Sequence, residues 1–252
     1  MIDLHCHILP GLDDGSGSAE ESLTMARMAI EDGIRTIVAT PHTLDGVYNV
    51  TPVEITGGVA SFRELLASRD LDLRVCEGAD VHLSPGIADK IKTGAVPTLN
   101  NTGKYFLMEL PAQTIPPGAK EEIFSLKIQG ITPVVTHPER HPAILQDMNL
   151  LYDFIAMGAL SQITAMSLTG EFGEDVQRCA QELLKHRLVH VIASDAHSPD
   201  SRPPLLSRAV NEAEELTGSE SFALSLVKGI PAKILAGELV EFPEPMRVRG
   251  QR

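Results

Sequence analysis

Short apolar runs alternate with amphipathic segments along the whole of this 252-residue sequence, and no other feature constrains its fold as strongly. Strands that alternate with helices imply a parallel sheet in an α/β fold. The runs are almost continuously apolar, as expected for parallel strands that are buried on both faces. We therefore predict seven strands, at residues 2–5, 36–40, from 73 toward 80, 105–108, 132–136, 161–164 and 189–193.

Helix start and stop signals fall between these apolar runs. Ser18-x-x-Glu21 has the pattern of a capping box, and the helix that follows is expected to end near Gly33. Thr51-Pro52-x-Glu54 supplies an N-cap, an N1 proline and an N3 glutamate for the next helix. Ser84-Pro85 is expected to cap a short helix. The remaining helices are expected at residues 118–129, 147–157, 173–186, 204–216, 219–228 and 231–236.

Histidines and carboxylates stand at the ends of six of the seven predicted strands. Imidazole and carboxylate groups are ligands that suit Mn, Fe and Zn. His5 and His7 point to the same side of the first strand, because side chains alternate with a period of two, so this pair can chelate one ion. An interpretation as ordinary core or surface residues would have to explain the strand-end position of every one. The candidate metal ligands are His5, His7, Asp14, His42, Asp80, Glu109, His137, Asp195 and His197.

The ligand positions discriminate between an open sheet and a closed barrel, which hydrophobic periodicity alone leaves open. In a barrel, the C-terminal ends of all strands form one ring around a shared site. In an open sheet, the outer strands would hold their ligands too far apart. Seven strands, rather than eight, favour a distorted or incomplete barrel. No linker or repeat interrupts the chain, so we predict one domain over residues 1–252, with 239–252 as a loose tail.

The remaining histidines are not predicted to bind metal. His186 lies near a helix end, where a cation interacts favourably with the dipole. His190 lies within the last strand, on the side away from the expected site. His82 and His141 lie in loops near the expected site, and we interpret both as surface histidines that could touch a substrate.

The cysteines do not support a thiol-based mechanism. Their number is odd and their spacing forms no framework, which fits a reducing compartment rather than a disulfide scaffold. An arginine six residues after a cysteine would signal a phosphate-binding loop, but Cys6, Cys76 and Cys179 are followed at that distance by Leu12, His82 and Lys185.

The composition of the chain indicates which classes of binding partner are unfavourable. The formal charge is −13, and no lysine or arginine cluster is evident, which disfavours nucleic acid as the main partner. No run of 18 apolar residues is present, so we predict no membrane insertion. The N-terminus runs from Met1 directly into the first ligand motif, and cleavage of a signal peptide would remove those ligands; we therefore expect a cytoplasmic location.

Seven short motifs follow one another along the chain: His5-Cys6-His7, Asp13-Asp14-Gly15, Ala39-Thr40-Pro41-His42, Leu83-Ser84-Pro85, Thr136-His137-Pro138-Glu139-Arg140, Ala193-Ser194-Asp195-Ala196-His197 and Arg202-Pro203-Pro204. These motifs, in this order, resemble those of the polymerase-and-histidinol-phosphatase (PHP) superfamily. Within it, the chain is similar to the manganese-dependent bacterial tyrosine phosphatases that are encoded with capsule and exopolysaccharide genes. The resemblance runs from residue 1 to about residue 238 and includes the segments Glu20–Leu23 and Ile163–Gly173.

The resemblance implies a distorted (β/α)7 barrel, similar to a TIM barrel, that holds up to three ions. Manganese is expected, with iron or zinc as alternatives. The resemblance also assigns the ligands to three ions. The first ion would be held by His5, His7, Asp80 and Asp195, the second by Asp80, Glu109 and His137, and the third by Asp14, His42 and His197. Position 80 departs from the family pattern, because a bridging glutamate usually stands where this chain has the shorter Asp80.

The resemblance also implies an activity. Metal-activated hydroxide would hydrolyse a phosphomonoester, while Arg140 and Arg202 grip the phosphate. Phosphotyrosine is the expected substrate, carried by the tyrosine-rich tail of a bacterial polysaccharide-chain-length kinase. His42 and His197 are candidates for proton donation, although a ligated histidine is a poor acid. Tyr48 is a candidate for packing against the substrate ring.

Three alternatives remain open on the sequence. The first is a phosphatase for a small metabolite such as histidinol phosphate, which would share the metals and differ at the rim of the pocket. The second is a regulatory, non-catalytic PHP module, which the nearly complete ligand set disfavours. The third is an amidohydrolase-type barrel, which also begins with a His-x-His motif but fits the other motifs less well.

Overall fold

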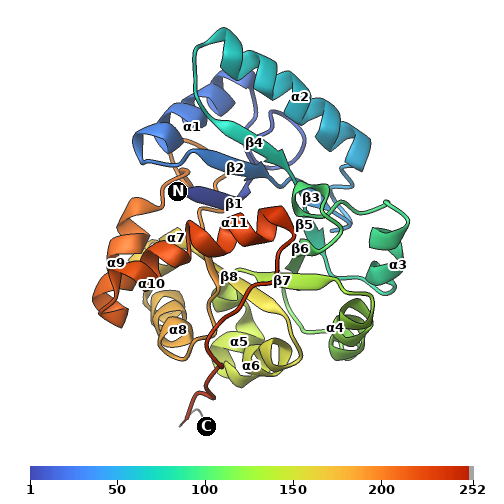
Figure 1. The fold of residues 1–252 in the computed structure, drawn as a ribbon, viewed down its shortest axis with the longest axis vertical. Helices are drawn as coiled ribbons and strands as arrows, with labels where there is room; N and C mark the ends of the chain where they lie inside the picture. Colours follow the sequence, from blue (N-terminus) through green and yellow to red (C-terminus); the bar gives the residue numbers. More distant parts are fainter. Residues whose placement is uncertain (250–252) are drawn as a thin grey trace.

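The computed structural model describes residues 1–249 as an α/β fold in which the strands pair in parallel (Figure 1). The first sheet has the order β1-β2-β4, formed by β1 (Ile2–Cys6), β2 (Thr36–Ala39) and β4 (Arg74–Glu77). The second has the order β3-β5-β6-β7-β8-β9. Its strands are β3 (His42–Thr43), β5 (Asp80–His82), β6 (Tyr105–Glu109), β7 (Thr132–Thr136), β8 (Leu160–Thr164) and β9 (Val191–Ala193).

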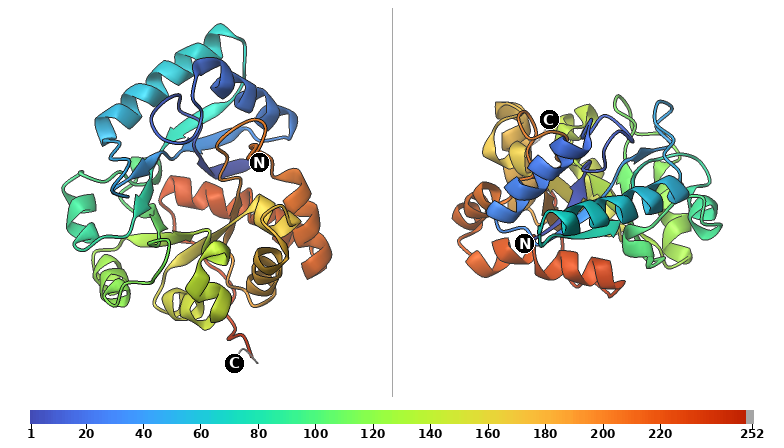
Figure 2. Two further views of the ribbon diagram at one scale, coloured as in Figure 1. Left: turned by 180° about the vertical axis from the view of Figure 1, so that it is seen from behind. Right: turned by 90° about the horizontal axis from the view of Figure 1, so that it is seen from above.

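The helices lie around the outside of the strands in all three ribbon views (Figures 1 and 2). Figure 1 places α1 and α2 beside the first sheet and α4, α6 and α8 beside the second. Two short 3₁₀ segments, η1 (Leu99–Asn101) and η2 (Pro138–Arg140), interrupt the connections. The α-helices are α1 (Ala19–Glu31), α2 (Pro52–Ser68), α3 (Ile87–Lys92), α4 (Ala119–Ile128), α5 (Pro142–Gln146), α6 (Asn149–Ala156), α7 (Ala165–Thr169), α8 (Glu174–Lys185), α9 (Ser207–Thr217), α10 (Glu220–Ser225) and α11 (Gly229–Ala236).

The strand residues form the centre of the core. Strand β8 is buried along its full length, and β1, β2 and β7 are buried at every residue but the first. This pattern confirms the expectation of strands covered on both faces, which the helices achieve by packing around them. No helix within residues 1–249 combines the length and the apolarity needed to cross a bilayer.

The prediction of one strand from residue 73 toward 80 is wrong, because this run forms two strands, β4 and β5, which belong to different sheets. The strand predicted at 36–40 is confirmed as β2, which ends at Ala39, but the short strand β3 that begins at His42 was not predicted. Pro41 lacks an N–H group and cannot donate to a ladder, so the pairing breaks there. Its carbonyl instead accepts the backbone N–H of Asp80, at 3.2 Å.

The two sheets also meet where the end of β1 lies beside the segment that follows β9. The backbone N–H of Asp195 donates to the carbonyl of His5, and the N–H of His7 donates to the carbonyl of Ala196, both at 2.8 Å. The segment after β9 therefore runs parallel to the end of β1. These contacts bring the first and last ligand motifs side by side.

The helix signals are correct in part. Thr51 and Glu54 form the complete reciprocal capping box at the start of α2. Ser18 caps α1, but the Glu21 carboxylate accepts the N–H of Gly17 rather than that of the N-cap residue. The expected cap by Ser84-Pro85 is wrong, because α3 begins after Gly86 in the left-handed conformation. The five-residue helices α5 and α7 were not predicted.

The segment expected to be a loose tail forms no helix or strand between residues 239 and 249. It nevertheless contacts the body of the protein. Phe242 lies 4.3 Å from the His190 ring, measured between centroids. The N–H of Met246 donates to the carbonyl of His186, and Val248 exchanges hydrogen bonds with the Asn149 side chain. The end of the expected tail, 250–252, lies outside the described residues.

Candidate metal centre

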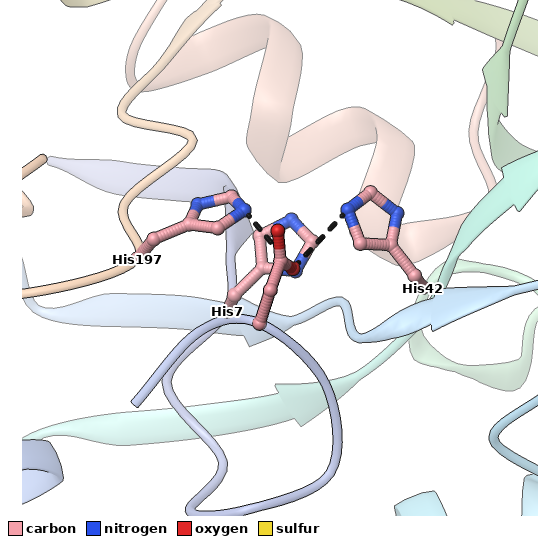
Figure 3. Close-up of side chains that lie close together, drawn as sticks. His7, His42 and His197 are labelled. Atoms are coloured by element: carbon pink, nitrogen blue, oxygen red, sulfur yellow. Dashed lines mark ion pairs between the residues drawn. The ribbon is translucent and has the colours of Figure 1, made fainter. Parts of the chain in front are cut away.

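All nine predicted ligands converge at the C-terminal ends of the strands. The imidazole Nε2 of His5 lies 3.5 Å from Asp80 Oδ2 and 3.4 Å from Asp195 Oδ1. The Nε2 atoms of His5 and His7 are 3.0 Å apart. The close-up in Figure 3 shows the rings of His7, His42 and His197 turned toward one common point.

The ligands reach this point from both sheets. His5 lies in β1, His42 in β3, Asp80 in β5 and Glu109 at the end of β6. The other five lie in segments that follow β1, β7 and β9. His137 and Asp195 have backbone φ angles of 34° and 52°, in the left-handed region that non-glycine residues seldom occupy. Strain of this kind persists only where the surroundings hold it, and it clusters at functional sites.

Three overlapping groups of donor atoms are close enough to share an ion, each with its atoms within 4.8 Å of one another. The groups are His7, Asp14, His42 and His197; His5, His7 and Asp80; and His42, Asp80 and Glu109.

These groups resemble the expected ones but differ in detail. His7 and His42 each belong to two groups. His137 lies slightly further out, with its Nε2 3.7 Å from Asp80 Oδ2 and 3.6 Å from Glu109 Oε1. Asp195 Oδ1 faces both His5 and His7. The assignment of individual ligands to individual ions stays a prediction.

Two buried atoms in the cluster point to a cation. Asp80 Oδ2 and His42 Nδ1 are buried and have no hydrogen-bond partner within residues 1–249. An unpaired carboxylate oxygen in the interior is costly unless a cation or donor faces it. The donor set of imidazole nitrogens and carboxylate oxygens is the set that divalent transition metals prefer, so the residues present fit a metal.

Supporting residues orient the first two histidines. His5 Nδ1 lies 2.9 Å from Gln162 Oε1, and His7 Nδ1 lies 2.6 Å from Asp13 Oδ2. An acceptor at Nδ1 fixes the tautomer that leaves the Nε2 lone pair free, which is the usual arrangement behind metal-binding histidines. The sequence analysis missed the role of Gln162, whose inward position in β8 depends on strand alternation and on a partner 157 residues away.

A buried aspartate, Asp3, connects β1 to the segment that follows β9. Asp3 accepts hydrogen bonds from the backbone N–H and the hydroxyl of Ser194, at 3.0 and 2.5 Å, and from the N–H of His5. Burial raises the pKa of Asp3 to about 6, although these hydrogen bonds act in the opposite direction. The sequence analysis did not assign a role to Asp3, whose partner Ser194 is 191 residues away.

Burial and neighbouring charges shift the pKa values of several side chains in the cluster. Burial alone would raise the pKa of Asp195, but Arg140, His5 and Arg202 hold it well below its usual range. Burial likewise opposes ionisation of Asp80, yet His5 and His137 lower its pKa. Burial lowers the pKa of His7 to about 4. The cluster therefore offers ionised carboxylates and a neutral His7, which are the protonation states that bind metal.

Two arginines complete the site. Arg140 and Arg202 both donate through Nη2 to the same atom, Asp195 Oδ2, with Arg202 at 2.6 Å. Both line a cavity of about 250 Å³ together with ligands that include Asp14, His42 and Glu109. The Nε atoms of both arginines are buried and lack a hydrogen-bond partner in the described part of the chain. They therefore hold unused donors beside the cluster.

The other residues near the site correct two expectations. His141 is 6% exposed and lies 3.0 Å from the carbonyl of Pro111, so it is not a surface histidine. His82 is half-buried, with Nδ1 3.7 Å from Glu109 Oε2. His186 lies at the end of α8, as expected. The Tyr48 ring lies 6.2 Å from that of His42, nearly parallel to it.

His190 and the cysteines are not among the residues that could bind a metal ion. His190 precedes β9 and is buried, and this burial lowers its pKa to about 3. The cysteines are free and buried, and burial raises the pKa of Cys179 to about 12. A thiol held protonated in this way is a poor nucleophile, in agreement with the sequence analysis.

The fold and the cluster together define a parallel α/β protein with a cluster of potential metal ligands at the C-terminal ends of its strands. Residues 1–236 match the family described as capsular polysaccharide synthesis, CpsB/CapC, and the chain belongs to that family.

Named relatives span most of the chain. It is 38% identical over 220 residues to the tyrosine-protein phosphatase YwqE of Bacillus subtilis, covering 87% of this chain and 86% of the relative. It is 31% identical over 245 residues to the tyrosine-protein phosphatase CpsB of Streptococcus pneumoniae, covering 95% and 100%.

Solved structures agree with this assignment. The fold is similar to that in the crystal structures of YwqE from Bacillus subtilis and CpsB from Streptococcus pneumoniae, described as unique metal-dependent tyrosine phosphatases. The TM-score is 0.95 at 35% identity, and the match covers 99% of this chain and 100% of the other. A lactonase from Listeria monocytogenes, with a TM-score of 0.57 at 14% identity, shares the fold alone.

Proposed function

We propose that this protein is a metal-dependent tyrosine phosphatase that acts in capsular polysaccharide synthesis. The observation that carries the proposal is the convergence of nine nitrogen and oxygen donors in one cluster, six of which line a cavity together with two arginines. Membership of the CpsB/CapC family and the names of the relatives supply the substrate class. The substrate is a phosphotyrosine protein, and we assign it to the tail of a bacterial tyrosine kinase.

His5, His7, Asp14, His42, Asp80, Glu109, His137, Asp195 and His197 hold up to three divalent cations, with manganese proposed as the metal. Bound there, these cations supply Lewis acidity, which activates water and neutralises phosphate oxygens. The chain itself favours the ionised forms of Asp80 and Asp195, whose pKa values neighbouring positive groups lower, and fixes His5 and His7 through Gln162 and Asp13. Three such cations beside the four carboxylates leave a local charge of about +2 by formal counting, so an acidic protein can still attract phosphate.

Arg140 and Arg202 bind the phosphate group. A guanidinium group presents donors in a planar fork that matches phosphate oxygens. Both arginines line the cavity and keep an unused Nε–H. We assign them to the equatorial oxygens, where negative charge must be stabilised during in-line attack on phosphorus. The Asp195 carboxylate holds them beside the cluster before the substrate arrives.

The site is open enough for a protein substrate. The Asp14 side chain is 49% exposed, although it lies 3.5 Å from both His42 and His197. The cluster therefore reaches solvent on this side. The leaving group of phosphotyrosine is a phenol with a pKa near 10, which reduces the need for a strong general acid. Tyr48 stands beside His42, where its ring can pack against that of the substrate.

We further propose that residues 1–252 form one domain and that the two sheets form one distorted (β/α)7 barrel. Seven strands result if β2 with β3, and β4 with β5, each count as one interrupted strand. The hydrogen bonds between the His5–His7 segment and the segment after β9 support closure of the ring. We place the protein in the cytoplasm, which the free, buried cysteines support.

Turnover of matched substrates tests the function. Phosphotyrosine peptides, phosphoserine peptides of the same sequence and histidinol phosphate are compared with Mn, Fe and Zn supplied separately. We expect phosphotyrosine to be preferred, EDTA to abolish turnover and Mn to restore it. Thiol alkylation serves as the control and should leave activity intact. Equal rates on all substrates would contradict the tyrosine assignment, and turnover insensitive to EDTA would contradict the metal requirement.

A further inference from the structure

One aromatic ring lies against both arginines of the site. The guanidinium carbon of Arg140 is 5.0 Å from the centroid of the Phe172 ring, and that of Arg202 is 6.0 Å from it. Both distances fall within the range of cation–π interactions. The arginines belong to different parts of the chain, since Arg140 ends η2 and Arg202 lies in the segment after β9. Phe172 is thus a shared neighbour of two side chains that the sequence places 62 residues apart.

The turn that carries Phe172 is fixed by its own contacts. It joins α7 to α8 between Gly170 and Gly173, which both have left-handed φ angles, of 96° and 94°. The N–H of Glu171 donates to the carbonyl of Met166, and the N–H of Gly173 donates to that of Gly170. The Glu171 carboxylate pairs with Arg208 at 2.9 Å. These contacts fix the backbone of the turn from which the Phe172 ring projects, without any contribution from a substrate.

The two arginines need such support because one carboxylate faces both of them. Arg140 and Arg202 share the single atom Asp195 Oδ2, and two like charges beside one oxygen repel each other. Asp195 Oδ1 also faces His5 and His7 in the metal cluster. A second carboxylate would occupy more of the N–H donors, whereas an aromatic face stabilises the cations and leaves the donors in the guanidinium plane free.

We propose that Phe172 is a positioning residue that holds Arg140 and Arg202 ready for phosphate. This inference rests on the proposed function and adds to it a residue that acts through the arginines. Both arginines belong to the described lining of the cavity, but Phe172 does not. The ring is therefore placed to act through the two guanidinium groups.

Binding of inorganic phosphate to the Mn-loaded protein, measured by calorimetry, tests the inference without turnover. Phe172→Leu keeps an apolar side chain but removes the aromatic face. Two cation–π contacts of this kind predict a loss of phosphate affinity of about five- to thirtyfold. Phe172→Tyr should recover most of that loss. Phe124→Leu is the matched control, because Phe124 is 58% exposed on α4, and its affinity should equal that of the wild type.

Two further measurements separate positioning from other roles. In the Arg140→Ala, Arg202→Ala background, Phe172→Leu should change phosphate affinity no further, since interacting residues are not additive. The Nε–H resonances of both arginines should also shift when the ring current of Phe172 is removed, while metal content stays constant. In steady-state assays, Phe172→Leu should lower kcat/KM for a phosphotyrosine peptide.

The outcomes that overturn the inference are distinct from failure of the proposed function. Unchanged phosphate affinity in Phe172→Leu would overturn it, as would the absence of phosphate binding by the wild type. An equal loss in the arginine-free background would show that the ring touches phosphate or substrate directly, and would also overturn it. Weakened phosphate binding in a protein that hydrolyses no phosphotyrosine would uphold the inference and contradict the proposed function.

Discussion

Asp80 is the residue on which the metal cluster depends most. It is fully buried, and its Oδ2 lies 3.5 Å from His5 and 3.7 Å from both His42 and His137. Its other oxygen accepts the Thr136 hydroxyl at 3.3 Å. Its strand, β5, thus brings the short aspartate side chain close to three imidazoles.

Substitution of Asp80 tests its role as a ligand. Asp80→Ala should lose at least one equivalent of bound metal and reduce turnover by more than about 100-fold, because loss of a ligand exceeds the effect of losing a supporting residue. Asp80→Glu should retain both metal and activity. Elemental analysis of the purified variants measures the first effect directly. Full metal content in Asp80→Ala would remove Asp80 from the ligand set.

At the scale of elements, the loop after β1 places two acidic residues with different tasks. Asp13 accepts from His7 Nδ1 and from the backbone N–H of His42, while Asp14 faces the rings of His42 and His197. The loop folds tightly against β1. A Cβ added at Gly15 would lie 2.2 Å from the carbonyl oxygen of His7 and 2.5 Å from its Cβ. Only glycine fits this approach, and backbone atoms cannot yield to a side chain.

Gly15→Ala should therefore displace the loop and the ligands that it carries. We expect a loss of about 1–3 kcal/mol in the free energy of unfolding, as for overpacked sites, together with reduced metal binding. Gly57→Ala is the matched control. Gly57 lies in α2 with no described atom within 4 Å of an added Cβ, so alanine there should add up to about 1 kcal/mol. Urea unfolding measures the free energy of unfolding of both variants, and equal values for the two would contradict this account.

Elements with long, regular signals were predictable from the sequence, and short ones were not. Residues 132–136 and 105–108 match β7 and nearly match β6, because buried parallel strands carry continuous apolar runs. The five-residue helices α5 and α7 are too short to show a helical period. The division of the strands into two sheets depends on which neighbour each strand pairs with, and that is a tertiary property.

The same distinction applies to the site. The residue types and local motifs predicted that the nine candidate ligands would lie together, and the family resemblance added both arginines; their roles in metal and phosphate binding stay predictions. The roles of Gln162, Asp3 and Phe172 were not predictable, because each depends on a partner that is remote in the sequence. An amide, a buried carboxylate and a phenylalanine have no fixed meaning until the fold shows what they contact.

At the scale of the whole molecule, the metal centre depends on nearly the entire chain. Its proposed ligands extend from His5 to His197, and the hydrogen bonds between β1 and the segment after β9 hold the first and last of them together. Ions bound by the folded arrangement but not by the unfolded chain would add to the stability of the whole domain. The acidic net charge of −13 is compatible with phosphate binding if cations occupy the cluster, because they would offset its carboxylates beside Arg140 and Arg202.

A crystal structure of the protein grown with manganese, with anomalous scattering recorded at the manganese edge, tests the central claim most directly. The account predicts anomalous peaks enclosed by the nine ligands, each within about 2.0–2.3 Å of imidazole nitrogens or carboxylate oxygens. Removal of manganese with EDTA should abolish the peaks. Manganese bound elsewhere, or ligand side chains turned away from one another with no peak between them, would contradict the account.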